Sequence, residues 1–169
     1  MAKKSSKASA GKPYPSLIDR RFDQIRLNME EHKVDALVVT YLPNIHYLTN
    51  FSGSAGTLFI LPGELHFVTD DRYEEQIKDE LYDLPNLETH ISRDVWGMAI
   101  EKNLFKDIEV LGFEADRMAY SEAVDIRNQI RPVKFKPAPQ VVEPYTMPKA
   151  PEELENILQN GRGCLRNYS

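Results

Sequence analysis

The stretch DALVVTYLPNIHYLTNFSGSAGTLFILPGELHFVT, residues 35–69, contains three short apolar runs and two very different connections. The runs lie at 35–40, 57–61 and 65–69. Their content of Val, Leu, Ile and Phe is typical of buried strands. Pro62-Gly63-Glu64 joins the last two runs, and a short Pro-Gly connection predicts an antiparallel hairpin. The other connection, 44–56, is expected to form a helical turn followed by a glycine-containing loop.

Around this stretch, the apolar spacing predicts helices that alternate with further strands. The positions Ile18, Phe22, Ile25 and Met29 form one face of a helix that should end near His32. Further helices are expected at 70–81, 95–105 and 120–130, and further strands at 87–91, 109–114 and 133–135. This order predicts an α/β sandwich with a mixed, mostly parallel sheet, an antiparallel hairpin and flanking helices.

The composition is that of an ordinary folded domain, with 169 residues, 41% hydrophobic and 28% charged, and a net charge of −5. It supplies enough apolar material for one core and too little chain for two large domains. A mildly acidic chain lacks the basic face of a nucleic-acid binder. No run approaches the roughly 18 apolar residues of a membrane helix, so neither nucleic acid nor membrane is an expected partner. The single cysteine, Cys164, excludes an internal disulfide and fits a reducing compartment, and we expect a cytoplasmic location.

Composition shifts divide the chain into four parts. Residues 1–15 mix Lys with Ser, Ala and Gly and are expected to be a flexible basic tail, with a transit peptide as the alternative. Residues 16–136 are the expected domain, and the five prolines of 137–151 indicate an extended linker. Residues 152–169 begin like a helix and end in GRGCLRNYS, which predicts either the start of an interrupted further domain or a disordered tail.

Five motifs occur in a characteristic order: VDALVVT (34–40), NIHYLTNFSGSAG (44–56), VTDDRY (68–73), LGFE (111–114) and KAPEEL (149–154). Through them the chain closely resembles, from about residue 17 to 158, the creatinase/prolidase N-terminal domain. That domain precedes the pita-bread metallopeptidase domain of Xaa-Pro aminopeptidases and Xaa-Pro dipeptidases. The resemblance implies a ribonuclease-H-like fold without nuclease chemistry. Residues 152–169 would then start a truncated C-terminal catalytic domain, although the Arg of the family's usual junction is missing.

The resemblance also implies an enzyme whose catalytic parts lie outside this chain. Such enzymes hold two divalent metals, usually Mn²⁺, Co²⁺ or Zn²⁺, in the C-terminal domain through two aspartates, a histidine and two glutamates. The chain alone is expected to be inactive and to hold no metal, while the full enzyme would act on proline-containing peptides as a homo-oligomer, with a dimer expected. The alternatives are a stand-alone protein-binding module and the N-terminal domain of a creatine-type amidinohydrolase.

The resemblance gives the connection 44–56 a role as a wall at the catalytic mouth of a neighbouring subunit, where it would exclude longer chains. The candidate wall residues are His46, Tyr47, Asn50, Phe51, Ser52, Gly53, Ser54 and Ala55. The alternative is structural, with polar side chains that pin the loop and glycines that permit a tight turn. A serine hydrolase is not indicated, because S-G-S-A-G before a strand lacks the G-x-S-x-G elbow before a helix.

Asp70-Asp71-Arg72-Tyr73 stands at an expected strand-to-helix junction. One aspartate is expected to cap the helix and Arg72 to form an ion pair, either within the domain or across a subunit contact. The alternatives are a metal-binding role for Asp70 or Asp71 and bidentate binding of a carboxylate by Arg72.

Trp96, with Ile100 and Leu104 at helical spacing, is expected to form a core stripe or part of a subunit interface. His32, His66 and His90 are scattered singly in the sequence. Each is expected to be a surface histidine or one with its hydrogen bonds satisfied, rather than a metal ligand.

Overall fold

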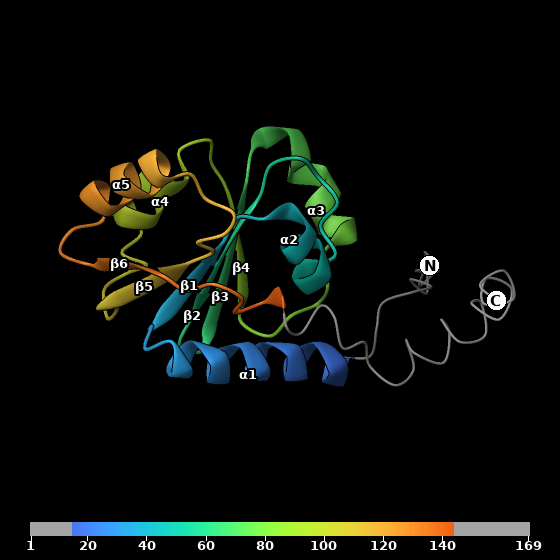
Figure 1. The fold of residues 1–169 in the computed structure, drawn as a ribbon. Helices are drawn as coiled ribbons and strands as arrows, with labels where there is room; N and C mark the ends of the chain where they lie inside the picture. The colour runs from blue at the N-terminus through green and yellow to red at the C-terminus, as the bar shows by residue number, and fades with distance from the viewer. Residues whose placement is uncertain (1–14, 144–169) are drawn as a thin grey trace, which may run out of the picture.

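The computed structural model describes residues 15–143, with side chains from Ile18 onward. In chain order the elements are α1 (Pro15–Glu31), β1 (Ala36–Val39), α2 (Leu42–Thr49), β2 (Thr57–Leu61), β3 (Glu64–Thr69), η1 (Asp71–Tyr73), α3 (Glu74–Glu80), β4 (Leu87–Ile91), α4 (Val95–Glu101), β5 (Val110–Phe113), α5 (Tyr120–Gln129) and β6 (Lys134–Pro137). They form three layers, with the sheet between two groups of helices (Figure 1). No helix in the described range is both long and apolar enough to cross a membrane.

The strands pair into one six-stranded sheet in the order β4-β3-β2-β1-β5-β6. β2 runs antiparallel to β1 and β3, whereas the other three pairs are parallel. The predicted hairpin is present, because Leu61 pairs with Glu64 across Pro62-Gly63. Gly63 has a φ of +75°, which suits the third position of a type II turn after proline. The expected α/β class, with a mostly parallel sheet and an antiparallel hairpin, is confirmed.

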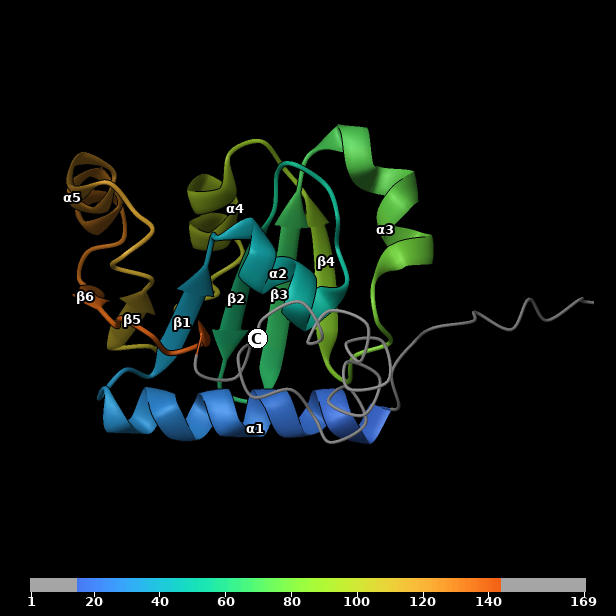
Figure 2. The same ribbon diagram turned by 45° about the vertical axis from the view of Figure 1, so that its right-hand side comes forward.

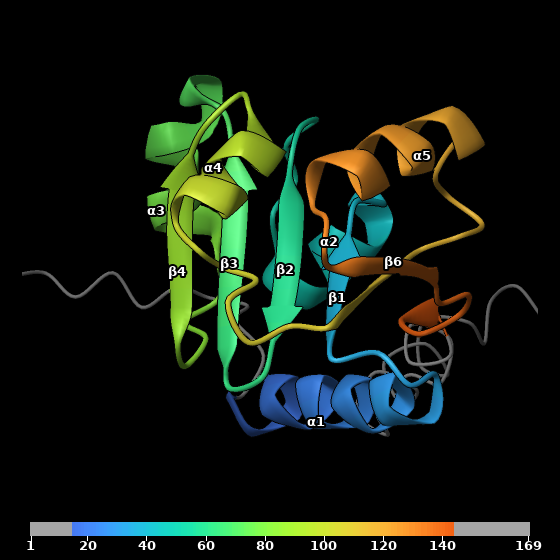
Figure 3. The ribbon, with the colours of Figure 1, turned by 90° about the vertical axis from the view of Figure 1, so that its left-hand side faces the viewer.

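Apolar side chains cover both faces of the sheet. One core lies against α1, α2 and α3 and includes the predicted helical face of Ile18, Phe22, Ile25 and Met29. The other core lies against α4 and α5. Figure 2 shows α2 and α3 in front of the sheet, and Figure 3 shows α4 and α5 on the opposite side. Because both faces are covered, the inner strands β1, β2, β3 and β5 are near-continuous apolar runs, whereas the edge strands β4 and β6 are more polar and more exposed.

The helix expected at 95–105 ends earlier, at Glu101. Asn103 adopts a left-handed conformation with a φ of 54°, so the chain turns away from the helix axis there. Leu104 therefore lies outside α4 but still packs against the second core, whereas Ile100 is 43% exposed, so the predicted core stripe is wrong at Ile100. Trp96 does pack in the second core, where its ring contacts Phe59, Phe105 and Phe135.

Residues after the expected boundary at 136 continue the packed domain. Ala138, Val141 and Val142 are buried in the first core. Asn28 of α1 fastens this segment, because its Nδ2 donates to the carbonyl oxygens of Gln140 and Val141 at 3.2 and 3.1 Å. The rest of the expected linker, the segment 152–169 and the expected basic tail apart from Pro15 lie outside the described residues.

Candidate functional site

The candidate wall begins inside α2, which carries His46 and Tyr47 and is a full helix of eight residues where only a helical turn was expected. Its C-cap Asn50 is left-handed, with a φ of 69° and a backbone N–H that donates to the carbonyl of His46. Thr49 Oγ1 donates to the Ile45 carbonyl and accepts from the backbone N–H of Phe51, at 2.7 and 3.2 Å. The end of the helix therefore sets the direction in which the loop leaves.

Phe51 is the anchor of this loop rather than part of its surface. Its side chain is only 1% exposed, and its ring centroid lies 4.9 Å from that of Phe67 and 5.3 Å from that of Tyr73. The backbone at Gly53 lies so close to the Phe51 ring that a Cβ there would overlap it, and a Cβ at Gly56 would lie 3.1 Å from it. The loop needs glycine at 53 because the chain passes directly over a buried aromatic ring.

The serines on either side of Gly53 are exposed, and each is tied to a residue far along the chain. The Ser52 hydroxyl donates to Glu80, and Gln76 Nε2 donates to the same carboxylate at 2.8 Å. Burial alone would raise the pKa of Glu80, but the hydrogen bonds from Ser52 and Gln76 outweigh it and lower that pKa. Ser54 meets the Tyr73 hydroxyl through its own hydroxyl at 2.5 Å and through its backbone N–H at 3.1 Å.

The remaining loop contacts come from its two ends. Asn50 Nδ2 donates to the Glu80 carbonyl at 2.9 Å, and Thr69 Oγ1 donates to the Ala55 carbonyl at 2.6 Å. His46 Nδ1 donates to the Phe51 carbonyl at 3.1 Å, while its side chain stays exposed. We call loop 50–56, turn 70–73 and Glu80 the rim, because these hydrogen bonds join them into one surface.

The acidic turn of the rim has the structural role expected for it. Asp70 is the N-cap of η1 and accepts from Arg72 through the backbone N–H and two side-chain N–H groups, at 3.0, 2.9 and 2.7 Å. The Arg72 guanidinium lowers the pKa of the Asp70 carboxyl. Asp71 pairs with Arg93 at 2.9 Å. Neither aspartate belongs to a cluster of three potential metal ligands in residues 15–143.

Two of the expected site residues lie away from the rim. The Tyr47 ring lies under the Arg21 guanidinium, whose carbon is 4.0 Å from the ring centroid, so Tyr47 ties α2 to α1. Trp96 lies in the core on the opposite side of the sheet. Of the expected wall residues, the rim therefore contains Asn50 and residues 51–55, and His46 lies next to it in the last turn of α2.

The rim has no arrangement for nucleophilic catalysis. The two serine hydroxyls bond to Glu80 and Tyr73, and neither bonds to a histidine within the described part of the chain. A serine nucleophile needs a base that is itself oriented by a third group. What the rim offers is a fixed polar surface with exposed hydroxyls.

Sequence reasoning missed Glu114, which ends the LGFE motif. Its buried carboxylate accepts from the backbone N–H groups of Thr40 and Tyr41 and from Asn44 Nδ2, at 2.8, 2.9 and 2.7 Å. Burial raises the pKa of this carboxyl, although the hydrogen bonds oppose the shift. An acidic residue directly after a buried strand was the available signal. Glu114 connects β5 to the start of α2 and so positions the helix that carries the loop.

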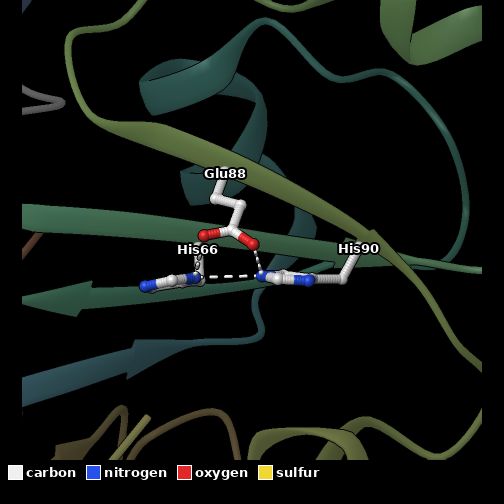
Figure 4. A group of neighbouring side chains, drawn as sticks. All are labelled: His66, Glu88 and His90. Carbon is white, nitrogen blue, oxygen red and sulfur yellow. Dashed lines mark hydrogen bonds and ion pairs between the residues drawn. The ribbon is translucent and has the colours of Figure 1, made fainter. Parts of the chain in front are cut away.

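His66 and His90, which are scattered singly in the sequence, come together in the fold, and each has a hydrogen-bond partner, as expected. Figure 4 shows them with Glu88, pointing toward one another from the neighbouring strands β3 and β4. Both rings are buried, and His66 Nδ1 lies 2.9 Å from His90 Nε2. Burial lowers the pKa of the His90 imidazole. The signal was E-x-H at 88–90 in a strand, but only the pairing of β3 with β4 brings His66 to it.

Known proteins provide three comparisons. The family model "Creatinase/Prolidase N-terminal domain" matches residues 21–145. An uncharacterised peptidase of Bacillus subtilis, YqhT, is 28% identical over 135 residues, which make up 80% of this chain and 38% of that protein. The chain thus spans 38% of this relative's length.

Solved structures show the same relationship. The Xaa-Pro dipeptidase from Bacillus anthracis is 25% identical with a TM-score of 0.70, over 82% of this chain and 38% of that one. An Xaa-Pro aminopeptidase structure from Streptococcus pyogenes is 27% identical with a TM-score of 0.66, over 77% of this chain and 98% of that one. The family model matches most of the chain. The order of the chain's motifs, the arrangement of its sheet and the similar solved structures all agree with that match. This chain belongs to the creatinase/prolidase N-terminal domain family.

Proposed function

We propose that this chain serves as the non-catalytic N-terminal domain of a longer, metal-dependent Xaa-Pro peptidase, in which the rim closes the catalytic cleft of a neighbouring subunit. Family membership and the relatives named as Xaa-Pro peptidases support the first part. The substrates would be proline-containing peptides. The assembly would be a homo-oligomer, a dimer in its simplest form, and the single cysteine fits the cytoplasmic location that we propose.

The observation that carries the second part is that the rim is held in one conformation. Asn50, Phe51, Ser52, Ser54 and Ala55 each have a partner on α2, α3, β3 or the turn 70–73. A surface that is already ordered loses little conformational entropy when a substrate or subunit docks on it. Ser52 and Ser54 are exposed, and their hydroxyls are held in place by Glu80 and Tyr73.

We also propose that the catalytic metals, two ions of Mn²⁺, Co²⁺ or Zn²⁺, bind to the C-terminal domain of the parent enzyme. Two-metal hydrolysis needs several oxygen and nitrogen ligands that converge on both ions. Within residues 15–143, the one cluster of three potential ligands is His66, Glu88 and His90, which does not fit a set of two aspartates, a histidine and two glutamates. No catalytic step is therefore assigned to this domain.

The first test is the size of the native protein. An antibody against this chain, used on a lysate of the source cells, should detect a band more than twice 19.4 kDa. A band at 19.4 kDa contradicts the proposal and favours the stand-alone binding module, whose partners would then be sought by pull-down.

The second test addresses the rim in that full-length protein. Ser52→Trp and Ser54→Trp fill the surface next to the proposed cleft, and we expect kcat/KM on Xaa-Pro peptides to fall about 10-fold, or about 1.4 kcal/mol of transition-state binding. Ser121→Trp, at an exposed position of α5, is the matched control and should leave the kinetics unchanged. Equal kinetics for all three variants would refute the role of the rim while leaving the peptidase assignment intact.

A further inference from the structure

We propose that His66, Glu88 and His90 form a binding site for one transition-metal ion, best suited to Zn²⁺, separate from the metals of peptide hydrolysis. His66 Nδ1, His90 Nε2 and a Glu88 carboxylate oxygen all lie within 4.8 Å of one another. Two imidazole nitrogens and one carboxylate are a ligand set that zinc accepts in proteins, with a fourth position left open.

Strand pairing places the three ligands on one face of the sheet. β3 and β4 are parallel, with His66 opposite Glu88 and Val68 opposite His90. Because side chains alternate along a strand, Glu88 and His90 project to the same face. The face is that of the second core, which contains Val68. The two buried imidazoles are thus supplied by two strands of the sheet and do not depend on a loop.

The distances between the ligand atoms are close to those around a tetrahedral ion. Ligand atoms about 2.0–2.1 Å from zinc in a tetrahedron lie roughly 3.3 Å apart. His66 Nδ1 lies 2.9 Å from His90 Nε2, and the carboxylate oxygens of Glu88 lie 3.9 and 3.8 Å from these two nitrogens. The imidazoles must separate by about 0.4 Å. The carboxylate must both approach and turn, because Oε2 is the oxygen near His66 and Oε1 is the oxygen near His90. Glu88 can make that movement, because its side chain is 62% exposed.

Glu64 holds His66 in the tautomer that metal binding through Nδ1 requires. The Glu64 carboxylate accepts from His66 Nε2 at 3.2 Å, so Nε2 carries the proton and Nδ1 presents its lone pair to the cluster. A carboxylate that accepts from the far nitrogen of a metal-binding histidine is a recurring arrangement that sets the tautomer and the ring orientation. In the metal-free cluster His90 Nε2–H donates to that lone pair. Metal binding would replace this hydrogen bond, and the His90 proton would lie on Nδ1.

A cleft beside the cluster leaves room for the remaining ligand. Its volume is about 500 Å³, and it lies between β3, β4 and the turn that follows α4. His66 and Glu88 line one side, while Lys102, Lys106 and Asp107 line the other. Water or a small anion can therefore reach the open coordination position. The lysines favour an anionic fourth ligand over a second cation.

The test uses zinc chloride, titrated calorimetrically into the full chain in a Cys164→Ser background, which removes the thiol as a competing ligand. We expect one Zn²⁺ per chain. We expect His90→Gln to weaken binding at least 100-fold, Glu88→Gln about 10-fold, and Glu64→Gln about 10-fold with one ion still bound. Replacement of Zn²⁺ by Co²⁺ should produce the visible absorption of a tetrahedral site. His32→Gln is the matched control, because it removes a histidine from outside the cluster, and it should bind like the parent chain.

The exposed position of Glu88 keeps the proposal testable if His90→Gln does not fold, since Glu88→Gln alters no buried side chain. Thermal unfolding with and without Zn²⁺ gives a second readout, and the rise in Tm should shrink in Glu88→Gln. The proposal is overturned if the parent chain binds no Zn²⁺, or if Glu88→Gln and Glu64→Gln bind as tightly as His32→Gln. None of these measurements depends on peptidase activity.

Discussion

Replacing Phe51 with alanine tests whether this residue anchors the rim. Removing a buried Phe side chain from a core costs about 3–5 kcal/mol, and each aromatic pair adds about 0.5–1.5 kcal/mol beyond the buried area. The ring is 1% exposed and makes two such pairs, with Phe67 and Tyr73. The loop over the ring, at Gly53 and Gly56, can partly collapse into the space. We therefore expect Phe51→Ala to lower the free energy of unfolding by about 4 kcal/mol.

Urea unfolding followed by circular dichroism measures this loss, with the free energy extrapolated linearly to water. A domain of ordinary stability, about 5–15 kcal/mol, stays folded after such a loss unless it lies near the lower limit. Tyr120→Ala is the control, because Tyr120 is 83% exposed and its removal should change stability by less than about 0.5 kcal/mol. A loss below about 2 kcal/mol for Phe51→Ala would show that the ring does not hold the loop as described.

Three further predictions concern single groups. Tyr73→Phe removes the hydroxyl that holds Ser54, so it should lower the free energy of unfolding by about 1 kcal/mol. It should also speed amide hydrogen exchange at residues 52–55, and an unchanged exchange rate would show that the Tyr73 hydroxyl does not hold the loop. Gly53→Ala places a Cβ against the Phe51 ring and should cost about 1–3 kcal/mol in urea unfolding, whereas a neutral result would show that the loop yields freely. Because burial raises the pKa of Glu114, its stabilising contribution is full below the ordinary value of 4.5 and is lost as the pH rises through the folded pKa. The stability of the wild-type chain relative to Glu114→Gln should therefore fall as the pH rises above 4.5, and a difference independent of pH would refute the shift.

The accuracy of the sequence predictions depends on whether the deciding contacts are local. The hairpin was predictable because Pro62 and Gly63 themselves favour the backbone conformation of the turn. Helix α1 was predictable because apolar residues recur every three or four positions and form one face. The end of α4 was not predictable, because apolar spacing continued to Leu104 while Asn103 took a left-handed conformation. Asparagine permits that conformation without requiring it.

The rim shows the same division. The segment 44–56 was recognised as a candidate from its own residues, but the partners that hold it lie elsewhere in the chain. Glu80 is 28 residues from Ser52, and Tyr73 is 19 residues from Ser54. Phe51 was expected at the surface of the wall and proved to be its buried anchor. The sequence around a single aromatic residue in a polar loop does not indicate whether its side chain will face the core or the solvent.

By itself, the sequence determined most of the strands and helices of this domain, its α/β class and the family to which it belongs, because side-chain periodicity, turn residues and motif order are local properties of the chain. Tertiary structure alone decided which distant groups meet. It brought Glu114 to the start of α2 and His66 to Glu88 and His90. Those meetings depend on strand order and register, which are set by burying both faces of the sheet at once. Because that requirement involves the whole chain, strand order and register cannot be predicted from any short stretch of the sequence.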